Sequence, residues 1–496
     1  MPDTLAPETA HSVKTRAISG VKVLAARTLI SVLLRVISSL CLAHLLFPKD
    51  YGLFGVAAYL SGLGAFLSDV GLGGALIRQS DKPTIDETFT VFWAQQALTA
   101  ILVVAVIALS PWLVHAYSLS HSAAVLLSVM TVGLFFNSLR LIPMMALERD
   151  LQYSAIARCE LIENIAQVGG TIVLAGLGCG AWALAGGGLL RGIVGLICIW
   201  LASPWRPHGT FQFAIVRRLA SFGIPFQLNA LVPSILGGWM TLAVSRLLGV
   251  AAVGLVGWAI NIASVPMMLN VVLNRVAFPA YSRLQSDPEA LAGYLRASVR
   301  RLNAILCLAI SIFVIVCPIA IPLIFGHRWI SAIPLVQWFS LEMILLTLNS
   351  LLCATQNATG YAADRLWVAL STGAIRAGIG WWAIAHFGLI GLGPAVCFAS
   401  LVELVASTQL VVFRHPHIAA LWPEIFRPLL LCGVILAVAQ GVGILISRSP
   451  LVICLVSLIL FVVLTASQDA LSRHRVIMTE LRGLLLMLQP TQARQG

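Results

Sequence analysis

The stretch LLFPKDYGLFGVA, Leu45 to Ala57, interrupts a long apolar run with a Pro-Lys-Asp triplet and then resumes it at once. A second stretch, LLGVAAVGLVGWA from Leu247 to Ala259, has the same skeleton: Leu-Leu, five residues, Gly-Leu, one residue, Gly. The glycines of the two stretches align at one constant offset of 202 residues. We interpret each stretch as a turn between two helices, whose glycines let the second helix pack closely. The duplication indicates that the chain contains two copies of one unit.

The composition around these stretches is that of a membrane protein. Hydrophobic residues make up 59% of the chain, charged residues 10%, and the mean hydropathy is +0.96. A soluble domain carries roughly a quarter charged residues. The apolar segments are about twenty residues long, which suits a membrane-spanning helix, and they are continuous rather than alternating as barrel strands would be. The chain is therefore predicted to be an all-α polytopic membrane protein.

Apolar runs between polar interruptions predict about fourteen transmembrane helices. They lie near residues 21–46, 52–77, 88–114, 122–147, 155–178, 182–203, 219–246, 252–279, 302–326, 332–356, 364–386, 390–413, 428–447 and 450–468.

Two further repeated sequence motifs support the duplication. The triplet NSL at Asn137–Leu139 recurs at Asn349–Leu351, and GLGCGAWALAGG (Gly176–Gly187) has a looser echo in FGLIGLGPAV (Phe387–Val396). We therefore expect two pseudo-symmetric six-helix lobes around a central cavity, as in transporters with parallel repeats. The predicted domains are a cytoplasmic tail (1–19), an N-lobe (20–203), a cytoplasmic linker (204–218), a C-lobe (219–413), two further helices (414–468) and a cytoplasmic amphipathic tail (469–496).

The distribution of Lys and Arg predicts that both termini are cytoplasmic. With the N-terminus inside, the cytoplasmic connections carry most of the basic residues, and the opposite loops carry little beyond Lys49, Arg246, Arg328 and Arg448. This asymmetry follows the positive-inside rule. It also accounts for the net charge of +12 without a nucleic-acid partner.

Two cytoplasmic segments are predicted to be surface helices. Ser286–Leu302 begins with Asp287, placed to cap a helix, and Pro288, which suits a first turn. We expect this helix to be separate from the following span at 302–326. The C-terminal tail places Ile477, Leu481, Leu484 and Leu488 on one face, as in a helix at the membrane interface.

Signals for other chemistry are weak. The ten cysteines are scattered without a CxxC motif and are interpreted as small apolar residues. The glycine-rich segment at Gly176–Gly188 lacks the lysine of a phosphate-binding loop, so we interpret it as a tight external turn with close helix packing. We find no nucleophile–base pattern. The sequence therefore predicts no enzyme, cofactor or metal site.

Charged residues within the spans are the candidate functional residues, since each costs roughly 2.5–3.5 kcal/mol at mid-bilayer. In the first span, Arg35 lies near the middle among serines and threonine at helical spacing, and Arg27 lies closer to the cytoplasmic end. The eighth span carries Asn261, Ser264 and Arg275 on one side. The other charges within spans are Asp69, Arg140, Arg191, Glu342, Arg376 and Glu403.

These deep cations outnumber the deep carboxylates, so the cavity is predicted to be positive and its cargo anionic. The predicted substrate-binding residues are Arg35, Arg27, Arg275, Arg140, Asn261 and Ser264. Asp69, Glu342 and Glu403 are the predicted groups for proton or ion coupling. For Arg376 an alternative stays open, in which it pairs with Glu342 or Glu403 and only holds one helix bundle together.

Several segments in order along the chain resemble the polysaccharide transporter family, the Wzx- or WzxC-like oligosaccharide flippases of the MOP superfamily, which also holds MATE exporters and lipid II flippases. The segments are LLFPKDYGLFGVA (Leu45–Ala57), LSDVGLGGALIRQ (Leu67–Gln79), ALERDLQYSAIARCELIE (Ala146–Glu163), GCGAWAL (Gly178–Leu184), VAFPAYSRLQSDPEALAGYLR (Val276–Arg296) and FGHRWISAIPLVQ (Phe325–Gln337).

The resemblance implies two six-helix lobes with two further helices. It also implies movement of an undecaprenyl-diphosphate-linked oligosaccharide from the cytoplasmic to the outer leaflet of a bacterial inner membrane. By position, the cavity-facing basic residues of such flippases correspond here to Arg27, Arg35 and Arg275. The chain departs from the family at Met240, where an Asp is frequent, and this puts any cation role of that position in doubt.

Three functions are compared. A flippase for exopolysaccharide or lipopolysaccharide assembly would act on lipid-linked oligosaccharide among membrane lipids, beside a polysaccharide polymerase and export machinery. A MATE-like drug or metabolite antiporter would favour a carboxylate-lined cavity, against which the arginine excess counts. A membrane-embedded glycan polymerase or ligase would need a large external domain, whereas the predicted external loops are short.

Overall fold

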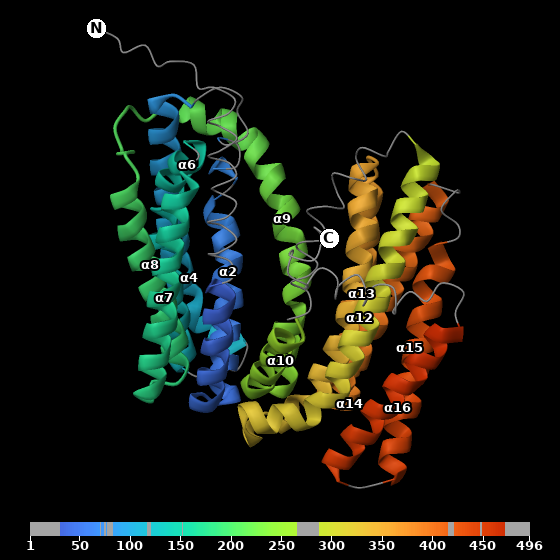
Figure 1. Ribbon diagram of the computed structural model, residues 1–496. Coiled ribbons are helices and arrows are strands. Elements are labelled where there is room, and N and C mark those ends of the chain that lie inside the picture. Colours follow the sequence, from blue (N-terminus) through green and yellow to red (C-terminus); the bar gives the residue numbers. More distant parts are fainter. Residues whose placement is uncertain are drawn as a thin grey trace, which may run out of the picture. The chain divides into compact units, whose positions relative to one another are not determined.

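The computed structural model describes residues 30–69, 71–73, 76, 83–116, 121–150, 152–264, 287–414, 421–446 and 449–471. Within these ranges the regular structure is helical, with no strand (Figure 1). The chain divides into two compact units, Met1–Gly254 and Leu255–Gly496. The division falls inside one helix, and the domain boundaries expected from the sequence remain a prediction.

The helices of the first unit follow the predicted spans closely. They are Ile30–Leu45, α2 (Pro48–Asp69), α4 (Ile85–Ala116), α5 (His121–Ser138), α6 (Leu141–Arg149), α7 (Tyr153–Gly176), α8 (Ala181–Ala202), α9 (Phe213–Leu248) and the start of α10 (Val250–Ala263).

The second unit contains longer helices. They are α12 (Pro288–Phe325), the 3₁₀-helix η2 (His327–Ala332), α13 (Ile333–Ala358), α14 (Ala362–Arg414), α15 (Leu421–Ile446) and α16 (Pro450–Leu471). Among the described residues, seven helices are long and apolar enough to cross a membrane, and three shorter apolar helices accompany them. The chain is thus an all-helical multi-pass membrane protein, and the count of about fourteen spans stays a prediction.

The two stretches with the shared skeleton form similar helix starts that touch each other. α2 begins at Pro48 and α10 at Val250. A Cβ added to Gly52 would overlap the carbonyl oxygen of Val250, and one added to Gly254 would overlap that of Pro48. The contact is reciprocal, because each glycine is four residues into its helix and faces the first residue of the other. Close packing at Gly52 is confirmed, whereas a Cβ at Gly55 would meet only ordinary van der Waals contact with Val253.

The glycine-rich segment forms the predicted tight turn and close packing between α7 and α8, which run side by side (Figure 1). The turn is closed by Gly178 and Gly180, both with positive φ. Along the antiparallel pair, Gly187 leaves room for the hydroxyl of Thr171, since a Cβ there would collide with it. This contact fixes the register in which polar side chains of the two helices meet.

The echo of this segment in the second unit adopts the same conformation. Gly180 has φ 56° and ψ −131°, and Gly388 has φ 61° and ψ −145°, a region that side-chain-bearing residues avoid. At Gly388 the residues of α14 divide into two helices, as the predicted spans 364–386 and 390–413 require. The sequence repeat therefore corresponds to a repeated backbone turn.

One expectation about helix limits is wrong. The predicted surface helix at Ser286–Leu302 is not separate from the following span, because α12 runs without a break from Pro288 to Phe325. Asp287 does cap it, accepting a hydrogen bond from the Ala290 N–H at 3.0 Å. No proline stands between Pro288 and Pro318 to end the helix, so the surface helix continues into the apolar span.

The predicted span at 122–147 corresponds to the apolar segment Ser122–Arg149, within which the helix is interrupted at Leu139 and Arg140, between α5 and α6. Pro143 has no N–H to donate to the Leu139 carbonyl, as a continuous helix would require. The indole Nε1 of Trp200 on α8 donates to that carbonyl instead, at 3.1 Å. The break places Arg140 at the start of a new helix.

The connection from α8 to α9 is bound to the start of α4. Thr84 and Glu87 form a capping box, with the Thr84 N–H donating to the Glu87 carboxylate at 2.8 Å. Asp86 accepts hydrogen bonds from the Thr210 N–H at 2.8 Å and from the Gln212 side chain at 3.2 Å. The predicted linker 204–218 is thus attached along part of its length, and its last residues already belong to α9.

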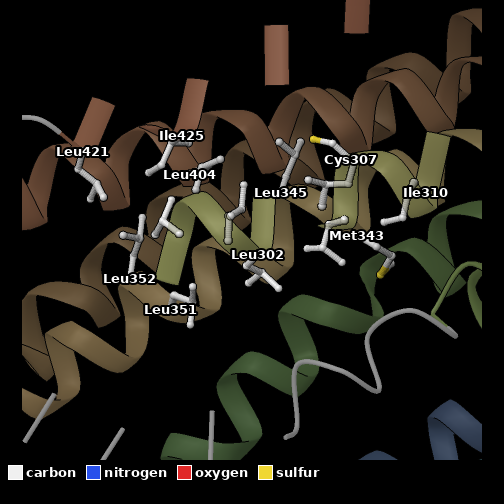
Figure 2. Close-up of a cluster of buried hydrophobic side chains, with 14 of the residues drawn as sticks. Leu302, Cys307, Ile310, Met343, Leu345, Leu351, Leu352, Leu404, Leu421 and Ile425 are labelled. Atoms are coloured by element: carbon white, nitrogen blue, oxygen red, sulfur yellow. The ribbon is translucent and has the colours of Figure 1, made fainter. Parts of the chain in front are cut away.

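The core of the second unit lies between α12, α13, α14 and α15 (Figure 2). Aliphatic side chains from the four helices point toward one another there, among them Leu302, Ile310, Met343, Leu345, Leu351, Leu404, Leu421 and Ile425. This packing supports the helices that carry the charged residues of the unit.

Candidate functional site

Three predicted site residues cannot be placed by their side chains. Arg27 and Arg275 lie outside the described residues. Asp69 is the last residue of α2, and its side chain is not described. Their predicted roles stay predictions.

Arg35 lies on the helix Ile30–Leu45 and is exposed. One turn before it, the hydroxyl of Ser31 accepts a hydrogen bond from the Asn164 amide of α7 at 3.4 Å. Toward the other end, Leu42 packs in one apolar cluster with Ala175 of α7. The helix therefore lies along α7, with an accessible arginine between two packed contacts.

A buried carboxylate on α7 gathers two arginines of the first unit. Glu163 is 1% exposed, and its carboxylate lies 2.6 Å from Arg140 Nη2 and 3.1 Å from Arg191 Nη2. Arg191 also donates from Nη1 to the Gln167 side chain at 3.4 Å. Gly195 leaves the space for this arrangement, because a Cβ there would collide with both Glu163 and Arg140. We name Arg140, Glu163, Gln167 and Arg191 the N-unit cluster.

Arg140 is predicted from the sequence to bind substrate, whereas Glu163 is not among the predicted site residues. The structure gives Arg140 a carboxylate partner and leaves its side chain only 13% exposed. Glu163 lies in the predicted span 155–178, so its position within the membrane was readable from the sequence. Its partners were not, because they come from two other helices.

The second unit holds a cluster of the opposite sign. Arg376 lies 2.8 Å from a Glu342 oxygen and 3.7 Å from a Glu403 oxygen, and it also hydrogen-bonds Ser400. Asn349 donates to Glu403 at 2.9 Å. We name these five residues the C-unit cluster. The pairing of Arg376 with Glu342 and Glu403 is thus observed. Whether the pair only holds the bundle together, or the two carboxylates serve in coupling, stays a prediction.

Asn261 and Ser264 lie at the end of the described part of α10. Asn261 is exposed, and the Ser264 hydroxyl donates to its carbonyl at 2.9 Å. The Asn261 amide is therefore accessible, as a cargo-binding role requires. That role stays a prediction.

A pocket of about 330 Å³ lies between α2 and α9 in the first unit. Its lining is mostly small or hydroxyl-bearing: Tyr59, Gly62, Leu63, Ser234, Gly237, Gly238 and Thr241. The Tyr59 ring packs directly over Gly238, where any Cβ would collide with it. Within the described ranges no group of three His, Cys, Asp or Glu side chains is arranged to hold a metal ion.

Comparison with known proteins adds to this geometry. A family model described as "Polysaccharide biosynthesis protein" matches residues 41–334. The chain is similar to the lipopolysaccharide biosynthesis protein WzxC of Escherichia coli (strain K12), with 27% identity over 66% of each chain. It is also similar to the succinoglycan biosynthesis transport protein ExoT of Rhizobium meliloti (strain 1021), with 25% identity over 75% of each. The chain thus spans about two thirds of the WzxC length.

Solved structures show the same fold. The lipid II flippase MurJ, in an inward closed conformation, superposes with a TM-score of 0.69 at 13% identity, over 90% of this chain and 98% of that one. An inward-facing multidrug MATE transporter of the MOP superfamily gives a TM-score of 0.62 at 17% identity, over 81% and 98%. The relatives carry the names of transport and biosynthesis proteins, in agreement with the prediction of a transporter rather than an enzyme.

Proposed function

Because the chain belongs to the polysaccharide biosynthesis protein family, we propose that it is a flippase for undecaprenyl-diphosphate-linked oligosaccharide repeat units. It would serve exopolysaccharide or lipopolysaccharide assembly in a bacterial inner membrane, with both termini cytoplasmic. The names of the relatives WzxC and ExoT support a polysaccharide pathway. The polysaccharide polymerase and export machinery would then be the partners that receive its product.

The observation that carries the proposal is the accessible Arg35 within an apolar helix. An exposed guanidinium at mid-membrane depth is too costly against lipid, so it requires a hydrated or anionic surrounding. Guanidinium groups match phosphate oxygens in pairs. The diphosphate of the cargo is the group that we assign to Arg35, together with Arg27 and Arg275.

The pocket between α2 and α9 supports a second element of the proposal. Its glycines and the absence of charged lining residues suit an apolar chain passing between helices. The prenyl tail would remain in lipid while the glycan crosses in a polar cavity. Rocking between inward- and outward-open states would expose the site alternately.

Deletion of the gene tests the function. We expect lipid-linked repeat units to accumulate on the cytoplasmic side, where an external glycosidase cannot reach them in intact spheroplasts. Complementation with Arg35→Ala should fail, and Arg35→Lys should restore export in part, because lysine keeps the charge and loses the fork. Arg158→Gln is the matched control, since this exposed arginine bonds only a carbonyl of its own helix.

Two results would contradict the proposal. Full export by Arg35→Ala at wild-type expression would exclude Arg35 from the cargo site. Normal turnover of repeat units in the deletion strain, with loss of resistance to cationic drugs instead, would favour the MATE-like antiporter. The net negative C-unit cluster is the feature of this chain that such an antiporter would use.

A further inference from the structure

We propose that Arg191 is a second anion-binding arginine beside Arg35, and that Glu163 and Gln167 hold its guanidinium in place. This inference rests on the proposed function and deepens it by adding residues of the N-unit cluster to the cargo site. The ligand group is a phosphate or diphosphate, which two arginines on neighbouring helices can bind together.

The helix register places the two arginines at one level. Ser31 accepts a hydrogen bond from Asn164 of α7, and further along Leu42 belongs to one apolar cluster with Ile172 and Ala175, so the two helices run parallel. Arg35 lies four residues after Ser31, and Val168 lies four residues after Asn164. Arg35 therefore falls beside Val168, the neighbour of Gln167. Arg191 reaches the same level from α8, because it hydrogen-bonds Gln167 directly.

The depths agree as well. Arg35 is ten residues before Leu45, where its helix ends, and Arg191 is ten residues after Ala181, where α8 begins. At 1.5 Å per residue both lie about 15 Å from those helix ends, near the middle of a bilayer.

The Arg191 side chain is 46% exposed at this depth. The exposed apolar residues of α8 form a stripe that includes Ile193, Ile197 and Leu201. Arg191 points about a third of a turn away from this stripe, at 100° per residue. Its exposure is therefore on the side of α8 toward α7 rather than toward lipid, where an unpaired charge would be costly.

The contacts of the cluster leave Arg191 with donors to spare. Glu163 is the only carboxylate shown within ion-pair distance of either arginine among the described residues, so the cluster carries one net positive charge. Arg191 uses Nε and Nη2 on Glu163 and Nη1 on Gln167. A guanidinium has five N–H donors, so an incoming anion meets a group already oriented and incompletely occupied.

Arg140 has a different position in the same cluster. Its side chain is 13% exposed, against 46% for Arg191. Glu163 is thus shared between a nearly buried arginine and an accessible one, and Arg191 is the arginine that a ligand can reach. Glu163 is a positioning residue in this scheme, because it acts on cargo through Arg191.

Binding of farnesyl diphosphate, farnesyl monophosphate and farnesol to the purified full-length chain in detergent tests the inference. These probes share one apolar chain and differ in charge. We expect Arg191→Gln to weaken farnesyl diphosphate binding about 10- to 100-fold, the loss expected for a hydrogen bond between charged groups. Arg191→Lys should bind with an intermediate Kd, and Arg158→Gln should bind as the wild type does.

The preference for diphosphate over monophosphate is the sharper measurement. If the two arginines bind one phosphate each, this preference should fall in both Arg35→Gln and Arg191→Gln. It should also fall in the double variant Glu163→Gln/Arg140→Gln, which retains Arg191 and the net charge of the cluster but removes its carboxylate anchor. A merely structural role of Arg191 would change the unfolding temperature without changing this ratio.

The outcomes separate the two proposals. The role of Arg191 would be overturned if Arg191→Gln bound with the wild-type Kd and phosphate preference while Arg35→Gln bound more weakly. If Arg191→Gln does not fold, Arg191→Lys takes its place in this comparison. Either result would leave the flippase proposal intact. A wild-type chain that binds farnesyl diphosphate no better than farnesol would overturn both.

Discussion

Gly52 and Gly254 each lie against the carbonyl of the residue that begins the other's helix, Val250 for Gly52 and Pro48 for Gly254. The four residues form a reciprocal contact in which the backbones of the two helices touch directly, near the first turn of each helix. Only a residue without a side chain permits such an approach. The repeated skeleton of the sequence is thus explained by a contact that both copies make together.

Substitution at this contact should destabilise the protein. Gly52→Ala or Gly254→Ala places a methyl group on a carbonyl oxygen and should cost about 1–3 kcal/mol, as overpacking does. The measurement is the unfolding temperature of the purified protein. Gly257→Ala is the matched control, because a Cβ there meets no atom within 4 Å. Equal unfolding temperatures for the Gly52 and Gly257 variants would mean that the contact is looser than described.

Removal of the Glu163 carboxylate should destabilise the first unit strongly. Glu163→Gln leaves Arg140 buried without a counter-charge, and breaking a buried pair in this way costs about 3–5 kcal/mol. The double variant Glu163→Gln/Arg140→Gln should recover much of the loss, since the buried cation is then gone. Thermal unfolding in detergent measures both, with Glu148→Gln, an exposed carboxylate, as the control. A double variant no more stable than the single one would contradict the pairing.

The C-unit cluster should respond to loss of its single cation. Arg376→Gln removes the partner of Glu342, whose side chain is 5% exposed, and should lower the unfolding temperature. Arg376→Lys should have a smaller effect, because an ammonium keeps the charge and cannot reach both carboxylates with a planar fork. Arg365→Gln on the same helix is the control, because Arg365 lies outside the C-unit cluster and its side chain hydrogen-bonds the Asn357 amide oxygen and the Cys353 thiol instead. Identical curves for the Gln and Lys variants would argue against a role of the charge.

The connection between α8 and α9 should open when its anchor on α4 is removed. Asp86→Ala loses the hydrogen bonds to Thr210 and Gln212, so chymotrypsin should cleave after the exposed Phe211 several-fold faster in the purified protein in detergent. Thr88→Ala is the control, because its hydroxyl bonds only carbonyls of its own segment. Unchanged cleavage in Asp86→Ala would show that Glu87 and Arg218 hold the connection without it.

Much of the helical framework was predictable because hydropathy and turn residues are local signals. The turn at Gly176–Gly188 and its echo near Gly388 were placed correctly, since glycines at such positions indicate backbone conformations that other residues avoid. The limits of α12 were not predicted. The charged residues before the apolar span show where the chain enters the membrane, but they do not end the helix. The break at Leu139 and Arg140 could not be predicted from the sequence. It depends on a contact from another helix, in which Trp200 donates a hydrogen bond to the Leu139 carbonyl that Pro143 leaves without a donor.

The site was less predictable for a related reason. Hydropathy shows which charges lie at membrane depth, but it does not show which residues of different helices pair. Arg140 was therefore predicted to be available for substrate, and its partner Glu163 was not predicted. For Arg376 the candidate partners were named correctly, because three charges of alternating sign left few choices.

The two charged clusters also bear on the ancestry of the chain. A half-length ancestor that paired with a copy of itself would have placed the same charges in both halves. The present protein buries a carboxylate between arginines in one unit and an arginine between carboxylates in the other. The two halves are therefore no longer interchangeable: in a chain built from two copies of either half, both clusters would have the same net charge, positive for the first unit and negative for the second.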